Sequence, residues 1–202
     1  ELVWKERAAR MHEVTDAMPV SNGVPLAAKL LALVGVVFAF QLLGGLASIA
    51  IQFAKGYAQV EPLVYLKTLA LNSVAFILMG GLALCLQVFT NNKFAGYAAL
   101  ILVMIGQGVL AYLDFTHNLY TFGNWPSAPY SDMNGYGHFL VPQLWFQLYW
   151  GVLLLALLLL SAALWVRGVD QGWRHRLKQL RTRMRGVRAA AFAASLLAFA
   201  GI

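Results

Sequence analysis

The stretch LWFQLYWGVLLLALLLLSAALWV, residues 144–166, decides the fold class of this chain. It contains no Asp, Glu, Lys or Arg, and its centre, Val152–Leu160, is entirely aliphatic. About 20 apolar residues in a helix cross the roughly 30 Å hydrocarbon core of a bilayer. Because lipid offers the backbone no hydrogen-bond partners, such a segment predicts a transmembrane helix.

Other segments share this character, and together they predict an all-α, polytopic helical membrane protein. Three further complete spans and the 14-residue start of a fifth are expected at residues 26–53, 62–89, 94–113 and 189–202. The expected organisation is an N-terminal cytoplasmic segment, three spans, a long periplasmic loop, a fourth span, a basic linker and a further span. These parts cover residues 1–24, 25–113, 114–142, 143–167, 168–188 and 189–202.

The composition excludes the main alternatives. The chain is 60% hydrophobic and 11% charged, whereas soluble domains are about 45–50% apolar and about 25% charged. A soluble protein of 202 residues has too small an interior for this much apolar surface, and a disordered chain would be far more polar. The single cysteine, Cys85, cannot form an internal disulfide and lies in an apolar run, which predicts a buried thiol.

The charges orient the spans. Of the 15 Lys and Arg residues, 13 fall on one side of the membrane if the spans alternate, and only Lys55 and Lys67 fall on the other. Eight of the 13 lie between Arg167 and Arg188. By the positive-inside rule, this side is cytoplasmic. The net charge of +7 is therefore explained without a nucleic-acid partner.

Two flanking segments have helical amphipathic patterns. Over residues 3–18, Trp4, Ala8, Met11 and Val14 have helical spacing between charged residues, and Pro19 ends the pattern. We expect one amphipathic helix with an intrahelical Glu6–Arg10 pair and its apolar stripe packed on the spans or the lipid interface. Over residues 174–188, a basic face is expected to rest on anionic lipid. That basic face consists of Arg174, Lys178, Arg181, Arg185 and Arg188.

The loop of residues 114–142, called here the long loop, contains many aromatic residues and no Lys or Arg. A loop of this length within a compact protein is usually functional or disordered. Its aromatic density argues against disorder and predicts short helices that re-enter or border the membrane.

Residues with catalytic or metal-binding potential are sparse. His12–Glu13 is followed by Asp16 where a zinc-protease motif needs its second histidine, and no glycine-rich phosphate loop occurs. The long loop offers Asp114, His117, Asp132 and His138, which are read either as a metal site or, preferably, as capping and interfacial residues. We therefore expect no catalytic residue, no metal site and no cofactor in this chain.

Polar residues within the spans allow two interpretations. Gln41, Asn72 and Gln107, together with Ser73 and Gln147, either join helices by hydrogen bonds or line a polar substrate path. No charge lies near the centre of a span, which disfavours an ion-coupled pump. Gly44–Gly45, Gly80–Gly81, Gly106 and Gly108 are expected to allow close helix packing.

The N-terminal pattern Glu6-Arg7 … His12-Glu13 … Pro19-Val20-Ser21 … Lys29 resembles the coupling-helix region of type-2 ABC exporter permeases. One group is more similar over nearly the whole chain: bacterial fusions of such a permease to a C-terminal zinc aminopeptidase of the aminopeptidase-N type. The resemblance rests on the coupling segment, the Ser131-Asp-Met-Asn-Gly-Tyr-Gly-His138 stretch and the Arg-rich linker. Where the family has a glycine after Glu-Arg, this chain has Ala8 and Ala9.

The resemblance implies a segment of an exporter's membrane domain in the bacterial inner membrane. Its implied partners are a separate ATP-binding cassette ATPase, the lipid bilayer, and a second permease half or an identical subunit. The ATPase would contact Arg7, Arg10, Glu13 and Asp16. The alternative is a membrane anchor for a periplasmic zinc aminopeptidase domain outside this chain, and any peptidase activity would belong to that domain.

Overall fold

The computed structural model describes residues 3–131, 133–168 and 172–202, and it confirms the all-α membrane fold. Four of its helical segments are long and apolar enough to span a membrane, and no β-strand occurs in the described ranges. They are α3 (Gly23–Ala54), α4 (Pro62–Thr90), α5 (Lys93–Tyr112), and the 3₁₀ turn η1 (Gly137–Phe139) continuing into α6 (Leu140–Leu164). The shorter helices are α1 (Lys5–Ala8), α2 (His12–Ala17), α7 (Trp173–Arg183) and α8 (Val187–Gly201).

Local sequence explains where the long helices begin and end. Pro62 opens α4, and Pro142 lies in the first turn of α6, where a missing N–H costs no intrahelical hydrogen bond. The sharp turn between α4 and α5 uses two asparagines. Asn91 ends α4 in the left-handed conformation, and the Asn92 side chain accepts hydrogen bonds from the N–H groups of Phe94 and Ala95.

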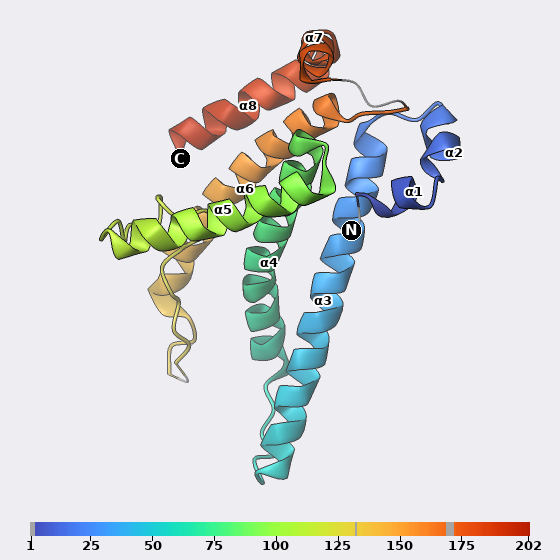
Figure 1. The fold of residues 1–202 in the computed structure, drawn as a ribbon. Helices are drawn as coiled ribbons and strands as arrows, with labels where there is room; N and C mark the ends of the chain where they lie inside the picture. The colour runs from blue at the N-terminus through green and yellow to red at the C-terminus, as the bar shows by residue number, and fades with distance from the viewer. Residues whose placement is uncertain (1–2, 132, 169–171) are drawn as a thin grey trace.

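Helices α4 and α6 form the centre of the fold, since α4 packs against α3, α5 and α6, and α6 also packs against α7 and α8 (Figure 1). Two adjacent glycines make this close packing possible. A Cβ added to Gly80 would lie 2.7 Å from Leu33 of α3, and one added to Gly81 would lie 2.7 Å from Leu154 of α6. The glycine-packing prediction is confirmed at these positions, whereas Gly106 and Gly108 of α5 face open space.

Burial divides the spans into inner and outer helices. In the most apolar window of each span, 33% of residues are buried in α4 and 39% in the η1–α6 segment, but only 6% in α3 and α5. One core cluster joins Leu78, Cys85, Trp150 and Leu154, which confirms the expected burial of Cys85. Large apolar side chains of α3 and α5 remain exposed, as lipid-facing or subunit-facing surfaces require.

The N-terminal segment differs from the prediction of a single helix over residues 3–18. It forms α1 and α2, separated by a break at which Arg10 adopts a left-handed conformation with φ 56°. Helical periodicity failed here because two separate attachments hold the segment. Trp4 and Arg7 donate hydrogen bonds to the spans' ends and Glu6 accepts one from Lys29, while Asp16 near the end of α2 accepts one from Gly168. The break allows both attachments.

The long loop also differs from its prediction. Its described residues form turns and the single 3₁₀ turn η1 rather than several short helices. They nevertheless fold back onto the spans. Phe122 and Trp125 pack on the α4–α6 core cluster, and a Cβ at Gly123 would lie 3.9 Å from Leu78, about halfway along α4. Trp150 fixes the loop by donating a hydrogen bond to the Asn124 carbonyl at 3.0 Å.

Candidate functional site

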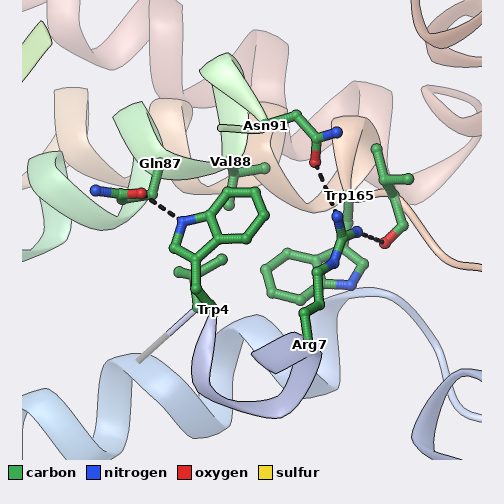
Figure 2. Close-up of a pocket in the computed structure, with 8 residues that line it drawn as sticks. Trp4, Arg7, Gln87, Val88, Asn91 and Trp165 are labelled. Carbon is green, nitrogen blue, oxygen red and sulfur yellow. Dashed lines mark hydrogen bonds between the residues drawn. The ribbon is translucent and has the colours of Figure 1, made fainter. Parts of the chain in front are cut away.

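The N-terminal segment is bound to the ends of the spans in a contact region that we call the basic junction. It consists of residues 3–18, the first turns of α3, the last turns of α4 and α6, and α7. Figure 2 shows Trp4 and Arg7 reaching from the N-terminal segment toward Gln87 and Asn91 at the end of α4. The indole Nε1 of Trp4 donates to Gln87 Oε1 at 2.5 Å, across 83 residues of sequence. The cavity between these groups holds only about 20 Å³, room for about one water molecule, so it is an internal packing contact.

Gln87 is itself held from the other side by α5. A Cβ at Gly96, the buried glycine of α5, would lie 2.6 Å from the carboxamide carbon of Gln87. The absence of a side chain at Gly96 therefore lets α5 approach α4 and leaves Gln87 room to receive Trp4. One side chain thus connects α4, α5 and the N-terminal segment.

Two charged residues of α1 extend these contacts. Arg7 donates to the Asn91 Oδ1 atom at 3.4 Å and to the Val166 carbonyl at 3.1 Å, so it bridges the ends of α4 and α6. Glu6 forms an ion pair of 2.7 Å with Lys29, whose side chain is only 6% exposed. A cation in the first turns of α3 opposes the helix dipole, and the Glu6 carboxylate offsets this cost. The expected Glu6–Arg10 pair is therefore wrong.

Helix α7 contributes two more arginines, which cap the C-terminal ends of α4 and α6. Arg176 is 4% exposed and donates to the carbonyls of Val88, Phe89 and Leu164 at 2.7, 3.0 and 3.0 Å. Arg183 donates to Ala163 and Trp165 at 3.1 and 2.7 Å. Carbonyls in the last turn of a helix lack intrahelical donors and carry partial negative charge, which a guanidinium satisfies.

The electrostatic environment of Arg183 reflects this crowding. Burial lowers the pKa of its guanidinium, and the positive charges of Arg167 and Arg188 lower it further. The group still carries its proton, because an arginine does not deprotonate in a folded protein. The Ala163 and Trp165 carbonyl oxygens, which accept hydrogen bonds from Arg183, offset part of this repulsion.

A second connection joins α2 to the chain that leaves α6. The Oδ2 atom of Asp16 accepts a hydrogen bond from the Gly168 N–H at 2.8 Å. Arg167 donates to the Met18 carbonyl at 3.5 Å. These two bonds link α2 directly to the residues that follow α6. A displacement of α2 would therefore be transmitted to the end of α6.

The four residues predicted to face an ATPase do not share one environment. Arg10 and Glu13 are exposed, as predicted, but Arg7 is directed into the junction and Asp16 is half-buried against Gly168. Beyond Trp4 the apolar stripe does not pack on the spans, and its packing on the lipid interface stays a prediction. Ala8 is exposed, and Met11 and Val14 are 60% and 66% exposed. The left-handed turn at Arg10 rotates these side chains away from the spans.

Arg176 and Arg183 were not among the residues singled out from the sequence. A signal for them exists, because Arg176, Leu180 and Arg183 are spaced by four and three residues and so share one helical face. That face carries the half-buried Leu180, whereas Arg174, Lys178 and Arg181 are exposed. The predicted basic face over residues 174–188 is wrong beyond α7, because that helix ends at Arg183 and Arg185 and Arg188 lie outside it.

The polar residues of the spans do not form one path. Asn72 is exposed and lines a cavity beside the long loop, whereas Gln41 and Gln107 are half-buried on α3 and α5 and line neither it nor the junction. Gln147 joins two helices, because its Nε2 atom donates to the Leu71 carbonyl at 3.2 Å. Gln147 thus confirms the helix-joining interpretation at one position.

The candidate metal ligands of the long loop are not assembled by the residues that the structure describes. No group of three His, Cys, Asp or Glu residues lies close enough to hold a metal ion in the described ranges, and Asp132 lies outside them. His117 instead accepts the Leu119 N–H through Nδ1 at 3.2 Å, and His138 packs on Phe139.

Fold and junction together define a multi-pass helical membrane protein whose basic segments are bound to the ends of its spans. No protein-family model, no curated protein and no solved structure matches the chain. The function is therefore argued from the chain's own residues.

Proposed function

We propose that the chain is a membrane-domain segment of an ABC-type exporter permease, in which the basic junction transmits movements of a separate ATPase to the spans. One observation carries this proposal: the N-terminal segment is attached to α3, α4 and α6 at once, through Glu6–Lys29, Trp4–Gln87 and Arg7–Val166. A segment attached in this way moves with the helix ends. A plain membrane anchor needs apolar spans and has no use for such a connection.

In this proposal, α2 provides the surface for the ATPase. Arg10 and Glu13 are exposed, and neither side chain has a hydrogen bond or ion pair in the described structure. Exposed charges of both signs favour partner orientation and choice more than raw affinity. Force applied there would reach α6 through Asp16–Gly168 and α4 through Arg7–Asn91. Rigid-body shifts of this kind are a common form of switching.

The remaining partners follow from the exposed surface. Helices α3 and α5 expose large apolar side chains along their lengths, including Phe40, Leu43, Leu102 and Ile105. We propose that lipid covers part of this surface and a second permease half, identical or homologous, covers the rest. The membrane would be the bacterial inner membrane, with the basic junction in the cytoplasm.

The test of coupling is a double charge reversal, Arg10→Glu with Glu13→Arg, in the full-length protein. Since neither side chain contacts the spans, the variant should insert and unfold like the wild type. Co-purification with the ATP-binding cassette subunit should fall about tenfold, as expected when orienting charges at an interface are reversed. Photo-crosslinking from position 14 with mass spectrometry identifies the subunit, and ATP hydrolysis in nanodiscs measures coupling.

Lys55→Glu is the matched control, because Lys55 is exposed at the other end of α3. It should bind the ATPase normally. If the double reversal retains wild-type binding and hydrolysis, the junction does not couple to an ATPase, and the anchor interpretation gains instead.

The proposed orientation is tested separately by cysteine labelling. In a Cys85→Ala background, Ser127→Cys in the long loop should react with a membrane-impermeant maleimide added to intact spheroplasts from outside. Arg181→Cys on α7 should react only after the membrane is opened, because 13 of the 15 basic residues place that side in the cytoplasm. Labelling in the opposite pattern would reverse the proposed topology.

A further inference from the structure

The long loop, α4 and the start of α6 line a cavity of about 480 Å³ that is open to the outside. This volume lies within the range of about 300–1,000 Å³ that is typical of small-molecule sites. Three aromatic side chains of the loop line it: Trp125, Tyr130 and Tyr136. Two carboxamides, Asn72 of α4 and Gln143 of α6, line it as well. Aromatic surface with a few convergent polar groups is the usual composition of a ligand site.

The side chain of Gln143 is the sharpest indication that the cavity receives a ligand. Gln143 is only 6% exposed, yet its carboxamide makes no hydrogen bond with the described residues. Its amide nitrogen and oxygen are not sealed from solvent, so they can bond a molecule in the open cavity. Gln147, one turn along the same face of α6, is 8% exposed and does have a partner, the Leu71 carbonyl. Of these two glutamines, only the one that lines the cavity has open hydrogen-bonding capacity.

The aromatic walls are held in place by contacts of their own. Tyr136 hydrogen-bonds Thr68 of α4 through its hydroxyl, and Tyr130 donates to Glu61 at 3.3 Å. The two tyrosine rings contact each other edge to face, with centroids 5.4 Å apart. Trp125 packs on the α4–α6 core cluster. A site held in this way loses little conformational entropy when a ligand binds.

The chemistry of the lining selects one class of ligand. Among the described residues, no Lys, Arg, Asp or Glu side chain lines the cavity, and the nearby Glu61 carboxylate already accepts a hydrogen bond from Tyr130, so the described lining favours a neutral ligand. A lipid tail would leave both carboxamides unsatisfied. Each carboxamide presents donors and an acceptor side by side, which complements adjacent hydroxyl groups, and aromatic faces accept the C–H surface of a ring.

We propose that this cavity is a binding site for a neutral, polyhydroxylated ring, the chemistry of a sugar, with Gln143 and Asn72 bonding its hydroxyls and Trp125 packing on its face. The site is separate from the basic junction and does not depend on the proposed coupling to an ATPase. It lies beside the loop that is expected to face the periplasm.

The test uses the full-length protein in lipid nanodiscs, prepared without sugar-headgroup detergents, which would occupy the site. Maltose and methyl glucoside are titrated by calorimetry, and saturable binding is expected below about 10 mM. Gln143→Met, which keeps the side-chain length, should weaken binding about tenfold, the equivalent of one buried hydrogen-bonding group. Its thermal midpoint should stay unchanged, because the Gln143 carboxamide makes no hydrogen bond with the described residues.

Gln147→Met is the matched control, since it changes the same side chain one turn away. It should lower the thermal midpoint, because the Leu71 carbonyl loses its donor, and leave the affinity unchanged. Three results would overturn the proposal: no saturable binding of either sugar, wild-type affinity in Gln143→Met, or saturable binding of a blocked dipeptide amide in their place. A fall in the Gln143→Met midpoint as large as that of Gln147→Met would also overturn it, by showing a purely structural role.

Discussion

Arg176→Met should lower the free energy of unfolding by about 3 kcal/mol, the scale of losing the charged donor of a buried network. The guanidinium is 4% exposed and caps three carbonyls at the ends of α4 and α6. Methionine fills similar space but donates nothing, so those carbonyls stay buried without a donor. The change should therefore loosen two spans at once.

Cys85 provides the measurement. It is the only cysteine of the 202-residue chain and is fully buried in the α4–α6 core cluster, so its reaction with a thiol-reactive fluorophore during a denaturing-detergent titration reports unfolding. Arg174→Met is the control, because Arg174 is exposed on the same helix and its loss should cost within about 0.5 kcal/mol. Equal stability of the two variants would refute the capping role of Arg176.

Gly81→Ala should destabilise the protein by about 1–3 kcal/mol, the usual cost of overpacking a filled interior. The added methyl group would lie 2.7 and 2.9 Å from the two terminal carbons of Leu154. Leu154 is 5% exposed and packed against Leu78, Cys85 and Trp150, so it has little room to move. Helices α4 and α6 would then separate at the centre of the fold.

The control for Gly81 changes a glycine that faces open space. A Cβ at Gly106 of α5 meets nothing within 4 Å, so Gly106→Ala should be neutral or stabilise the helix by about 0.5 kcal/mol. Both variants can be followed through Cys85 labelling in the same titration. A shift of the same sign and size in both would show that helix propensity, and not the α4–α6 contact, governs the effect of Gly81→Ala.

Residues of the basic junction show why the sequence predicted this site only in part. The charged N-terminal segment and the basic linker were correctly identified as special, because charge and amphipathicity are visible along the chain. The periodicity of residues 3–18 nevertheless predicted the wrong partner for Glu6 and did not predict the contacts of Arg7 with Asn91 and Val166. An amphipathic pattern indicates two faces, but it does not determine which face will find hydrogen-bond partners at the ends of other helices.

The sugar-site cavity was predictable to a smaller extent. Aromatic residues and tight turns in the long loop indicated defined structure, and Asn72 was already singled out as a polar residue of possible use. Gln143 was not singled out, because the sequence alone does not distinguish a glutamine in the first turn of a span from any other polar residue at a helix end. Its importance arises only from the combination of 6% exposure, the cavity, and the lack of a partner in the described residues.

The sequence by itself determined the class of protein, the number of spans and, through its charges, their expected orientation. It could do so because lipid imposes a length, an apolar composition and a helical backbone on every spanning segment, and these properties are local. Only the tertiary structure decided that α4 and α6 are central, that Trp4 meets Gln87 across 83 residues, and that Arg176 caps two helices. Those contacts depend on which helix ends and which glycine-containing helix faces pack together, and a local sequence pattern does not determine that packing.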